Sequence, residues 1–145
     1  MSDTALFVEE RIIQAVSSLM TGRVNELLED RADHIPPLDF SGGPGAVCPK
    51  IGLALGDRSE KDRIIKVDGY VLTITLIVPE LDGERNCYAY AALVEQALRE
   101  DVTLGGAVDR AVLADKQYTP PKIPYCGDGW EAVFTLRITV EGMAL

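Results

Sequence analysis

The sequence predicts an α+β fold in which a mainly antiparallel β-sheet packs against two α-helices on one face. Residues 130–140 alternate strictly between apolar and other side chains, which is the period of a half-buried strand. A long apolar run at 70–78 has room for a second such strand. Two segments, 4–20 and 86–101, carry apolar residues at helical spacing instead. An antiparallel sheet with one buried face and helices covering that face accounts for all four segments.

Length and composition predict a single domain that spans residues 1–145, because a chain of 145 residues can bury its own core. Hydrophobic residues make up 47% and charged residues 26%, the balance of a soluble globular protein. No apolar run reaches the ~18 residues that a membrane helix needs. The N-terminal MSDTALFVEE is acidic where a secretory signal is basic. We therefore expect synthesis in the cytoplasm and no contact with a membrane.

The first expected helix covers residues 4–20. Its apolar side chains fall on one stripe of a helix; they are Leu6, Ile12, Ile13, Val16, Leu19 and Met20. The Thr21-Gly22 step predicts the end of this helix. Residues 24–30 suit one or two further helical turns.

Residues 34–50 predict an irregular connection between this helix and the sheet. The segment HIPPLDFSGGPGAVCPK holds four prolines and three glycines, which interrupt regular elements. A phosphate-binding loop requires GxxxxGK[ST] between a strand and a helix. Lys50 instead follows a proline and precedes an expected strand, so we predict no nucleotide site here.

The expected sheet covers residues 51–142 together with the second helix. It begins with a short strand at 51–55, followed by a polar turn at 56–62. The next segment, RIIKVDGYVLTITLIVPE, holds two apolar runs around Asp68-Gly69. An Asp-Gly step between such runs is a strong hairpin signal, so we predict a tight turn there.

The second expected helix is capped by Asn86 and ends near Asp101. Its apolar stripe is formed by Tyr90, Leu93, Val94, Ala97 and Leu98. A strand at 111–118 and a long loop at 119–129 lead to the last strand. Both long strands of the sheet have one apolar face and one threonine-rich face. The apolar faces predict the core, and the threonine-rich faces meet either water or another subunit.

The charge balance argues against binding to nucleic acid. The chain has 14 basic and 23 acidic residues, a formal net charge of -9, and no basic cluster. Affinity for nucleic acid rests largely on Lys and Arg side chains that neutralise phosphates. An acidic surface does suit a protein that DNA passes without sticking, because like charges repel.

Neither enzyme activity nor a cofactor is expected. Nucleophilic catalysis needs a base beside the nucleophile. The one histidine is His34, and its sequence context leaves a pairing with Cys48 open, although nothing around Cys48 has the form of a nucleophile motif. Three widely spaced cysteines predict reduced thiols rather than a disulfide framework.

No metal site is expected either, because zinc needs more Cys or His ligands at suitable spacing. One acidic stretch has partial helical spacing and is more typical of a solvated helix face than of a cation site; it comprises Glu26, Glu29, Asp30 and Asp33. Trp130 and Tyr125, near the CGDG turn, could contact a ligand. The simpler expectation is that Trp130 begins the core face of its strand.

The Thr-Leu-Gly-Gly step at Gly105 and Gly106 predicts a structural turn. Glycines beyond the end of a helix permit positive φ and close backbone approach. They follow a helix and precede a strand, which is the reverse of a dinucleotide-binding turn. A phosphate-binding function is therefore not expected.

The order of these elements resembles the tail terminator and minor tail (tail completion) proteins of long-tailed phages and prophages. The resemblance runs from about residue 50 to residue 142, and the N-terminal helix also fits. Its sharpest part is DVTLGGAV at 101–108, which follows ALVEQALRE. This motif is short and structural rather than catalytic.

The resemblance implies an α+β subunit of a homo-oligomeric ring, usually a hexamer, located in the virion tail and in the host cytoplasm during assembly. Such a ring caps the tail tube protein and meets the head–tail connector protein, while DNA only passes through its lumen. Two alternatives stay open. One is another connector or neck component, and the other is a host-encoded small ligand-binding or adaptor module.

Exposed loops on a rigid sheet commonly carry partner contacts. We therefore expect partner proteins to contact the two polar loops, 56–62 and 119–129, and not the helices. The candidate interface residues on these loops are Arg58, Glu60, Lys61, Tyr125 and Asp128.

Overall fold

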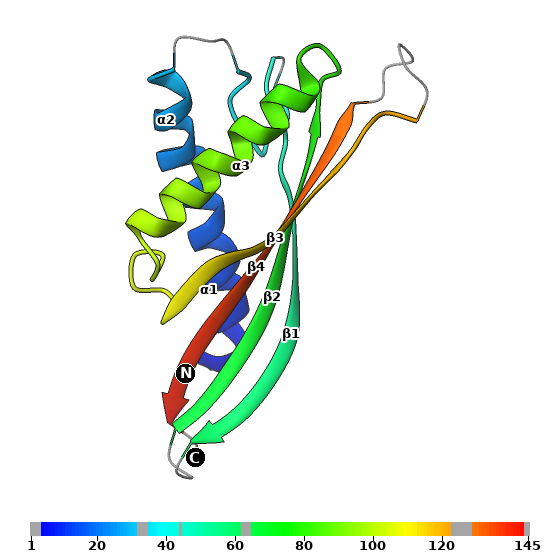
Figure 1. Ribbon diagram of the computed structural model, residues 1–145. Coiled ribbons are helices and arrows are strands. Elements are labelled where there is room, and N and C mark those ends of the chain that lie inside the picture. The colour runs from blue at the N-terminus through cyan, green and yellow to red at the C-terminus, as the bar shows by residue number, and fades with distance from the viewer. Residues whose placement is uncertain (1–3, 32–34, 44, 62–64, 123–128, 144–145) are drawn as a thin grey trace.

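The computed structural model describes residues 4–31, 35–43, 45–61, 65–122 and 129–143. Four antiparallel strands form one sheet in the order β1-β2-β4-β3. Two long helices, α1 and α3, lie on the same side of it (Figure 1). The elements are α1 (Thr4–Leu19), the π-helical turn η1 (Met20–Val24), α2 (Asn25–Glu29), β1 (Lys50–Lys61), β2 (Ile65–Val78), α3 (Gly83–Glu100), β3 (Arg110–Thr119) and β4 (Trp130–Met143). The predicted α+β class is confirmed.

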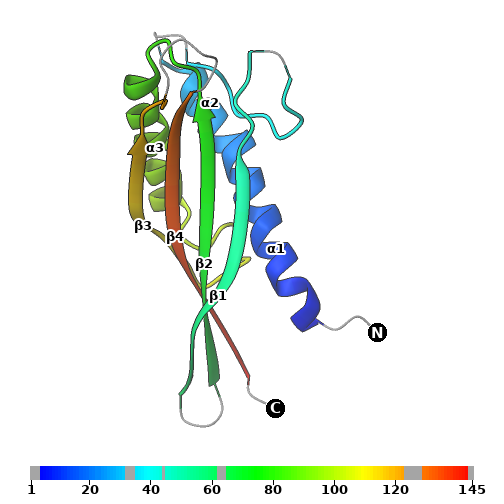
Figure 2. The ribbon, with the colours of Figure 1, turned by 90° about the vertical axis from the view of Figure 1, so that its right-hand side faces the viewer.

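The core lies between the helices and the two central strands. Leu72, Ile74 and Phe134 are fully buried, and Leu72 and Ile74 stand opposite Leu136 and Phe134 across the β2–β4 ladder. The helices contribute further fully buried residues, Ile12, Val16, Met20, Tyr90 and Val94. Viewed from the other side, the sheet is uncovered and the helices lie behind it (Figure 2). The predicted division of each long strand into a core face and an outer face is confirmed.

The predicted hairpin at Asp68-Gly69 is wrong. Both residues lie inside β2, where Asp68 pairs with Val140 and Gly69 with Thr139 of β4. Because β4 pairs with all fourteen residues of β2, its ladder overrides the local turn preference of an Asp-Gly step. Lys61 of β1 stands opposite Ile65 of β2, and residues 62–64 lie outside the described residues.

The predicted polar turn at 56–62 is wrong for residues 56–61, and residue 62 lies outside the described residues. β1 continues to Lys61, and its register against β2 shifts once, between Leu55 and Arg58. Such an irregularity lets a strand absorb an extra residue while its pairing goes on. The predicted strand at 51–55 is therefore only the first half of β1.

The N-terminal helix does not stop at Thr21-Gly22. It passes through the π-helical turn η1 into α2, as the expected further turns at 24–30 had suggested. The buried residues explain the wider turn, since they recur every four positions: Ile12, Val16, Met20, Val24 and Leu28. In a regular α-helix each such step would drift by about 40° around the axis. A π turn takes up that drift and keeps the stripe against the sheet.

The connection at 35–49 is irregular, as predicted, but it is fixed to the helices. Leu38 and Val47 form an isolated parallel bridge. The side chain of Asn25 hydrogen-bonds both backbone groups of Leu38, and the Tyr90 hydroxyl donates to the carbonyl of Pro36. These contacts anchor a segment that has no ladder of its own.

The predicted N-cap at Asn86 is wrong, because α3 begins three residues earlier, at Gly83. Asp82 precedes it in the left-handed region with φ 56°. Asn86 therefore lies within the helix, where it is only 4% exposed. Its Oδ1 atom has no hydrogen-bond partner in the described part of the chain.

Candidate functional site

Three of the expected interface residues lie on a strand rather than on a loop. Arg58, Glu60 and Lys61 stand at the far end of β1, opposite Asp68, Lys66 and Ile65 of β2. This end of the β1–β2 pair projects beyond the helices (Figure 2). Tyr125 and Asp128 lie outside the described residues.

Gly105 and Gly106 form the predicted turn, with φ of 69° and 90°. The carboxylate of Asp101 fixes it by accepting hydrogen bonds from the backbone N–H of Gly105, at 2.8 Å, and from the Thr103 hydroxyl, at 3.2 Å. Left-handed backbone costs least for glycine, which suits both residues to this turn, and the neighbouring Leu104 also has a positive φ, of 51°. The turn carries the chain from α3 to the edge strand β3.

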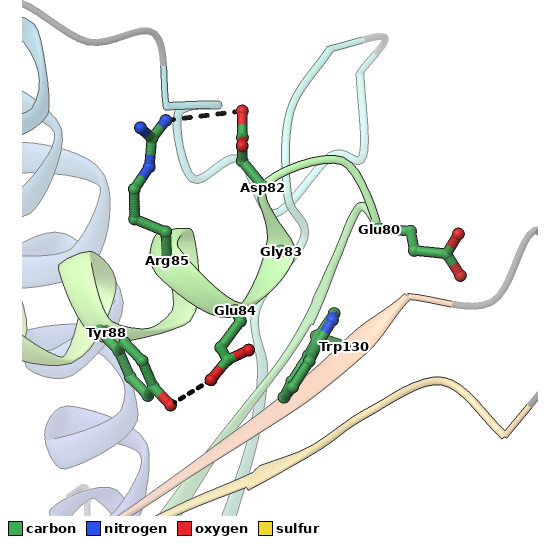
Figure 3. Close-up of a pocket in the computed structure, with 7 residues that line it drawn as sticks. All are labelled: Glu80, Asp82, Gly83, Glu84, Arg85, Tyr88 and Trp130. Atoms are coloured by element: carbon green, nitrogen blue, oxygen red, sulfur yellow. Dashed lines mark hydrogen bonds and ion pairs between the residues drawn. The ribbon is translucent and has the colours of Figure 1, made fainter. Parts of the chain in front are cut away.

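A pocket of about 540 Å³ lies beside Trp130, at the N-terminal end of α3. Its other lining residues are Glu80, Asp82, Gly83, Glu84, Arg85 and Tyr88, and Figure 3 shows them around the indole ring. Gly83 permits the close approach of helix and strand, because a Cβ atom there would lie 2.5 Å from Trp130 Cδ1. Trp130 thus begins the core face of β4, as expected, and also packs against the first residue of α3.

The polar groups of this pocket are tied to one another. The Tyr88 hydroxyl donates to Glu84 Oε1 at 2.8 Å, and Arg85 pairs with Asp82 at 3.5 Å. The hydrogen bond to Glu84, together with burial, raises the pKa of Tyr88. The Glu84 carboxylate in the first turn also stabilises α3 through the helix dipole. The excess of carboxylates beside an indole ring favours a cationic group over an anionic one.

Among the described residues, the remaining candidates do not assemble into a site. The Cys48 thiol is exposed and donates to the Phe40 carbonyl at 3.4 Å, while His34 lies outside the described residues. Glu26 pairs with Arg23 at 3.5 Å. Across the part of the chain that the structure describes, no group of three His, Cys, Asp or Glu side chains is placed to hold a metal ion.

Sequence reasoning named Trp130 as a possible ligand contact but missed the α3 side of its pocket, because Gly83 and Trp130 are 47 positions apart. The acidic residues at 80–84 were a signal for the start of a helix. Nothing in the pattern of β4 indicates that Gly83 would lie under the indole.

No protein-family model matches this chain, and a search of curated proteins finds no match to it. None of the helices in the described ranges has both the length and the apolar character needed to span a bilayer.

Proposed function

We propose that this protein is a structural subunit of a phage or prophage tail, of the tail terminator type. In this proposal the protein assembles as a ring that caps the tail tube and joins it to the head connector. The family resemblance implies that this ring is a hexamer. It acts by binding other proteins rather than by catalysis.

The observation that carries the proposal is the arrangement of elements around the glycine turn. β2 ends just before Pro79, α3 follows, and residues 101–108 lead through two positive-φ glycines into β3 and then β4. This is the order on which the resemblance rests. The uncovered sheet face adds support, since a subunit of an assembly needs surface beyond its own core.

Complementation tests the proposal. A strain whose phage or prophage lacks the gene is expected to produce tails of irregular length without heads. Wild-type protein is expected to restore tails of uniform length with heads attached, as seen by negative-stain electron microscopy. Uniform tails that merely lack heads would instead indicate a neck component, and normal virions without the protein would refute both assignments.

The far end of β1 provides a sharper arm of the same assay. Arg58→Glu combined with Lys61→Glu is expected to leave the protein folded and to lower the fraction of tails that carry heads. The matched control is Arg99→Glu with Lys116→Glu, which changes the net charge equally at exposed positions of α3 and β3. Equal loss in both double variants would show a general charge effect rather than a contact at β1.

The Trp130 pocket favours a second candidate, a ligand-binding or adaptor module. An indole, a tyrosine and several carboxylates suit a Lys or Arg side chain of a partner peptide. Titration with a lysine-rich peptide, followed by tryptophan fluorescence, tests this candidate because Trp130 is the only tryptophan in the chain. Unchanged fluorescence at saturating peptide would count against it.

A further inference from the structure

The chain contains a short proline-rich segment at residues 119–124, which reads TPPKIP. Its last four residues have the form PxxP, and its one charged residue is a lysine. Proline fixes φ at about −65°, so peptides of this composition favour the extended polyproline II conformation. Such peptides bind grooves that are lined by aromatic side chains, and they lose little conformational entropy when they bind. The segment is therefore a candidate ligand for an aromatic pocket.

The pocket beside Trp130 has aromatic walls. Trp130 and Tyr88 both line it, and its volume of about 540 Å³ is in the range of pockets that hold small ligands. Tyr88 is 49% exposed, and its ring meets that of Tyr118 edge to face at a centroid distance of 4.9 Å. Leu81, which lies between two lining residues, is 84% exposed. The pocket thus offers a peptide both aromatic and apolar contacts.

The charges of the pocket match a lysine. Three carboxylates line it, those of Glu80, Asp82 and Glu84, against the one guanidinium of Arg85, which pairs with Asp82 at 3.5 Å. Glu84 accepts a hydrogen bond from Tyr88 and keeps acceptor positions for more, because a carboxylate has about four of them. Figure 3 shows Glu84 beside the indole ring, so one ammonium group can contact both.

The charges beyond the lining leave this balance unchanged. Toward β3 the helix-facing surface continues to Tyr118, where Glu95 and Lys116 bring one charge of each sign. The excess of carboxylates therefore stays at the pocket itself.

Within one copy, the segment lies on the opposite side of the sheet from this pocket. Pro120, Pro121 and Lys122 line a hollow that also contains Glu131. Side chains alternate along a strand, so Glu131 points away from the face to which Trp130 belongs. In the described part of the chain no ion pair joins Lys122 to Glu131. The lysine is thus available to a pocket on another molecule.

We propose that the segment 119–124 of one copy binds in the Trp130 pocket of a second copy. The prolines pack on Trp130 and Tyr88, and the Lys122 ammonium group meets the carboxylates of the pocket. Because segment and pocket are different surfaces, each copy offers one of each, and the contact is head-to-tail. This inference rests on the second candidate function, a pocket for a cationic peptide, and names that peptide.

A capped peptide of sequence TPPKIP, titrated into the full-length protein, tests the contact. The emission of Trp130 and the heat of titration both report binding, which is expected to saturate. Changing the peptide lysine to glutamate, or its three prolines to alanine, is expected to weaken binding by at least about tenfold, because the first removes the charge match and the second the preformed conformation. Glu84→Gln is expected to weaken binding, whereas the matched control Glu29→Gln, at an exposed position of α2, is not.

A lysine-rich peptide without proline separates the two ways of failing. If it binds and TPPKIP does not, the pocket accepts cationic peptides and the inference is overturned. Equal binding of TPPKIP and its alanine version would overturn it as well. If neither TPPKIP nor the lysine-rich peptide binds, the inference and the second candidate function fail together.

Mixing two variants tests whether the partner is a second copy. Lys122→Glu alters the segment and keeps the pocket, and Glu84→Lys does the reverse. In sedimentation equilibrium the wild-type mass is expected to rise with concentration from 15.8 kDa. Each variant alone is expected to stay near that mass, and the mixture to reach about twice it, because an intact pocket then meets an intact segment.

Circular dichroism melting checks that each variant folds, and Lys122→Gln and Glu84→Gln replace a charge reversal that does not fold. A wild type that stays monomeric at all concentrations would overturn the inference, as would a mixture that associates no better than its two components.

Discussion

The side chain of Asn25 hydrogen-bonds both backbone groups of Leu38. Its Nδ2 donates to the Leu38 carbonyl at 2.8 Å, and its Oδ1 accepts from the Leu38 N–H at 2.8 Å. One amide therefore replaces the two hydrogen bonds that a neighbouring strand would supply. Leu38 is 2% exposed, so water does not readily take over these bonds.

Asn25→Asp is expected to lower the free energy of unfolding by about 1–3 kcal/mol, because the carboxylate loses the donor and faces a carbonyl oxygen. Urea denaturation at neutral pH measures the change. Asn25→Gln keeps the amide but moves it by one methylene, and it is expected to be destabilised as well. Wild-type stability in the Asp variant would show that the clamp does not hold the 35–49 connection.

Gly83→Ala is expected to destabilise the protein by about 1–3 kcal/mol, since an added methyl would overlap the Trp130 ring. The displaced indole should also change its fluorescence emission. Gly22→Ala is the control, because a Cβ atom there meets nothing within 4 Å and alanine favours helix. Unchanged stability and emission in Gly83→Ala would refute the close packing.

Gly105→Val is expected to cost about 1–2 kcal/mol, for a reason of backbone conformation alone. A Cβ atom at Gly105 meets nothing within 4 Å, but φ is 69°. Gly105→Asn is the matched control, because asparagine tolerates left-handed backbone better than a β-branched residue does. Equal melting temperatures for the two variants would show that φ is not the cause.

The sequence indicated the elements whose periodicity is long and unambiguous. The alternation along β4 and the apolar stripe of α3 led directly to their buried faces. The Asp68-Gly69 error has the opposite origin, since fourteen ladder pairs with β4 outweigh a local preference that a single sequence displays clearly. The four-residue spacing from Ile12 to Leu28 was visible, but only the wider turn at η1 shows what it means.

The candidate sites were less accessible from sequence because they depend on contacts between distant segments. Gly83 meets Trp130 only through the packing of α3 on β4. The side chains that share the uncovered sheet face are set by the register of β4 with β2 and β3. Registers of this kind follow from the whole sheet rather than from one strand.

Burial raises the pKa of the Cys87 thiol from 9.0 to about 11, with the nearby Glu84 carboxylate adding to the effect. The folded state therefore favours the protonated thiol. Its contribution to stability is complete below pH 9 and is lost as the pH rises toward 11. Cys87→Ala is expected to show a smaller fall in melting temperature than the wild type between about pH 8.5 and about pH 11, because the variant lacks this titrating group.

Buried Tyr90 is present in both the wild type and the Cys87→Ala variant, and its pKa is raised by burial and by the Cys87 charge. The comparison therefore measures the thiol together with its effect on Tyr90. Parallel melting curves across this range would contradict the assignment. A thiol reagent at neutral pH provides a second measurement in a Cys126→Ser background. It should modify exposed Cys48 quickly and Cys87 only at the rate of opening.

Deletion of Gly22 is expected to convert η1 into regular α-helix and leave the protein folded. With one residue removed, Met20 and the former Val24 are three positions apart, so the buried stripe regains the spacing that an α-helix requires. A Cβ atom at Gly22 would meet nothing within 4 Å, so this position faces open space. Deletion of Ala91 is the control: it lies within α3, which contains no wider turn, so the following residues would rotate by about 100° away from the sheet. Cooperative thermal unfolding followed by circular dichroism distinguishes the two. A Gly22 deletion that loses the folded state as completely as the Ala91 deletion would show that the π turn does not arise from the four-residue spacing.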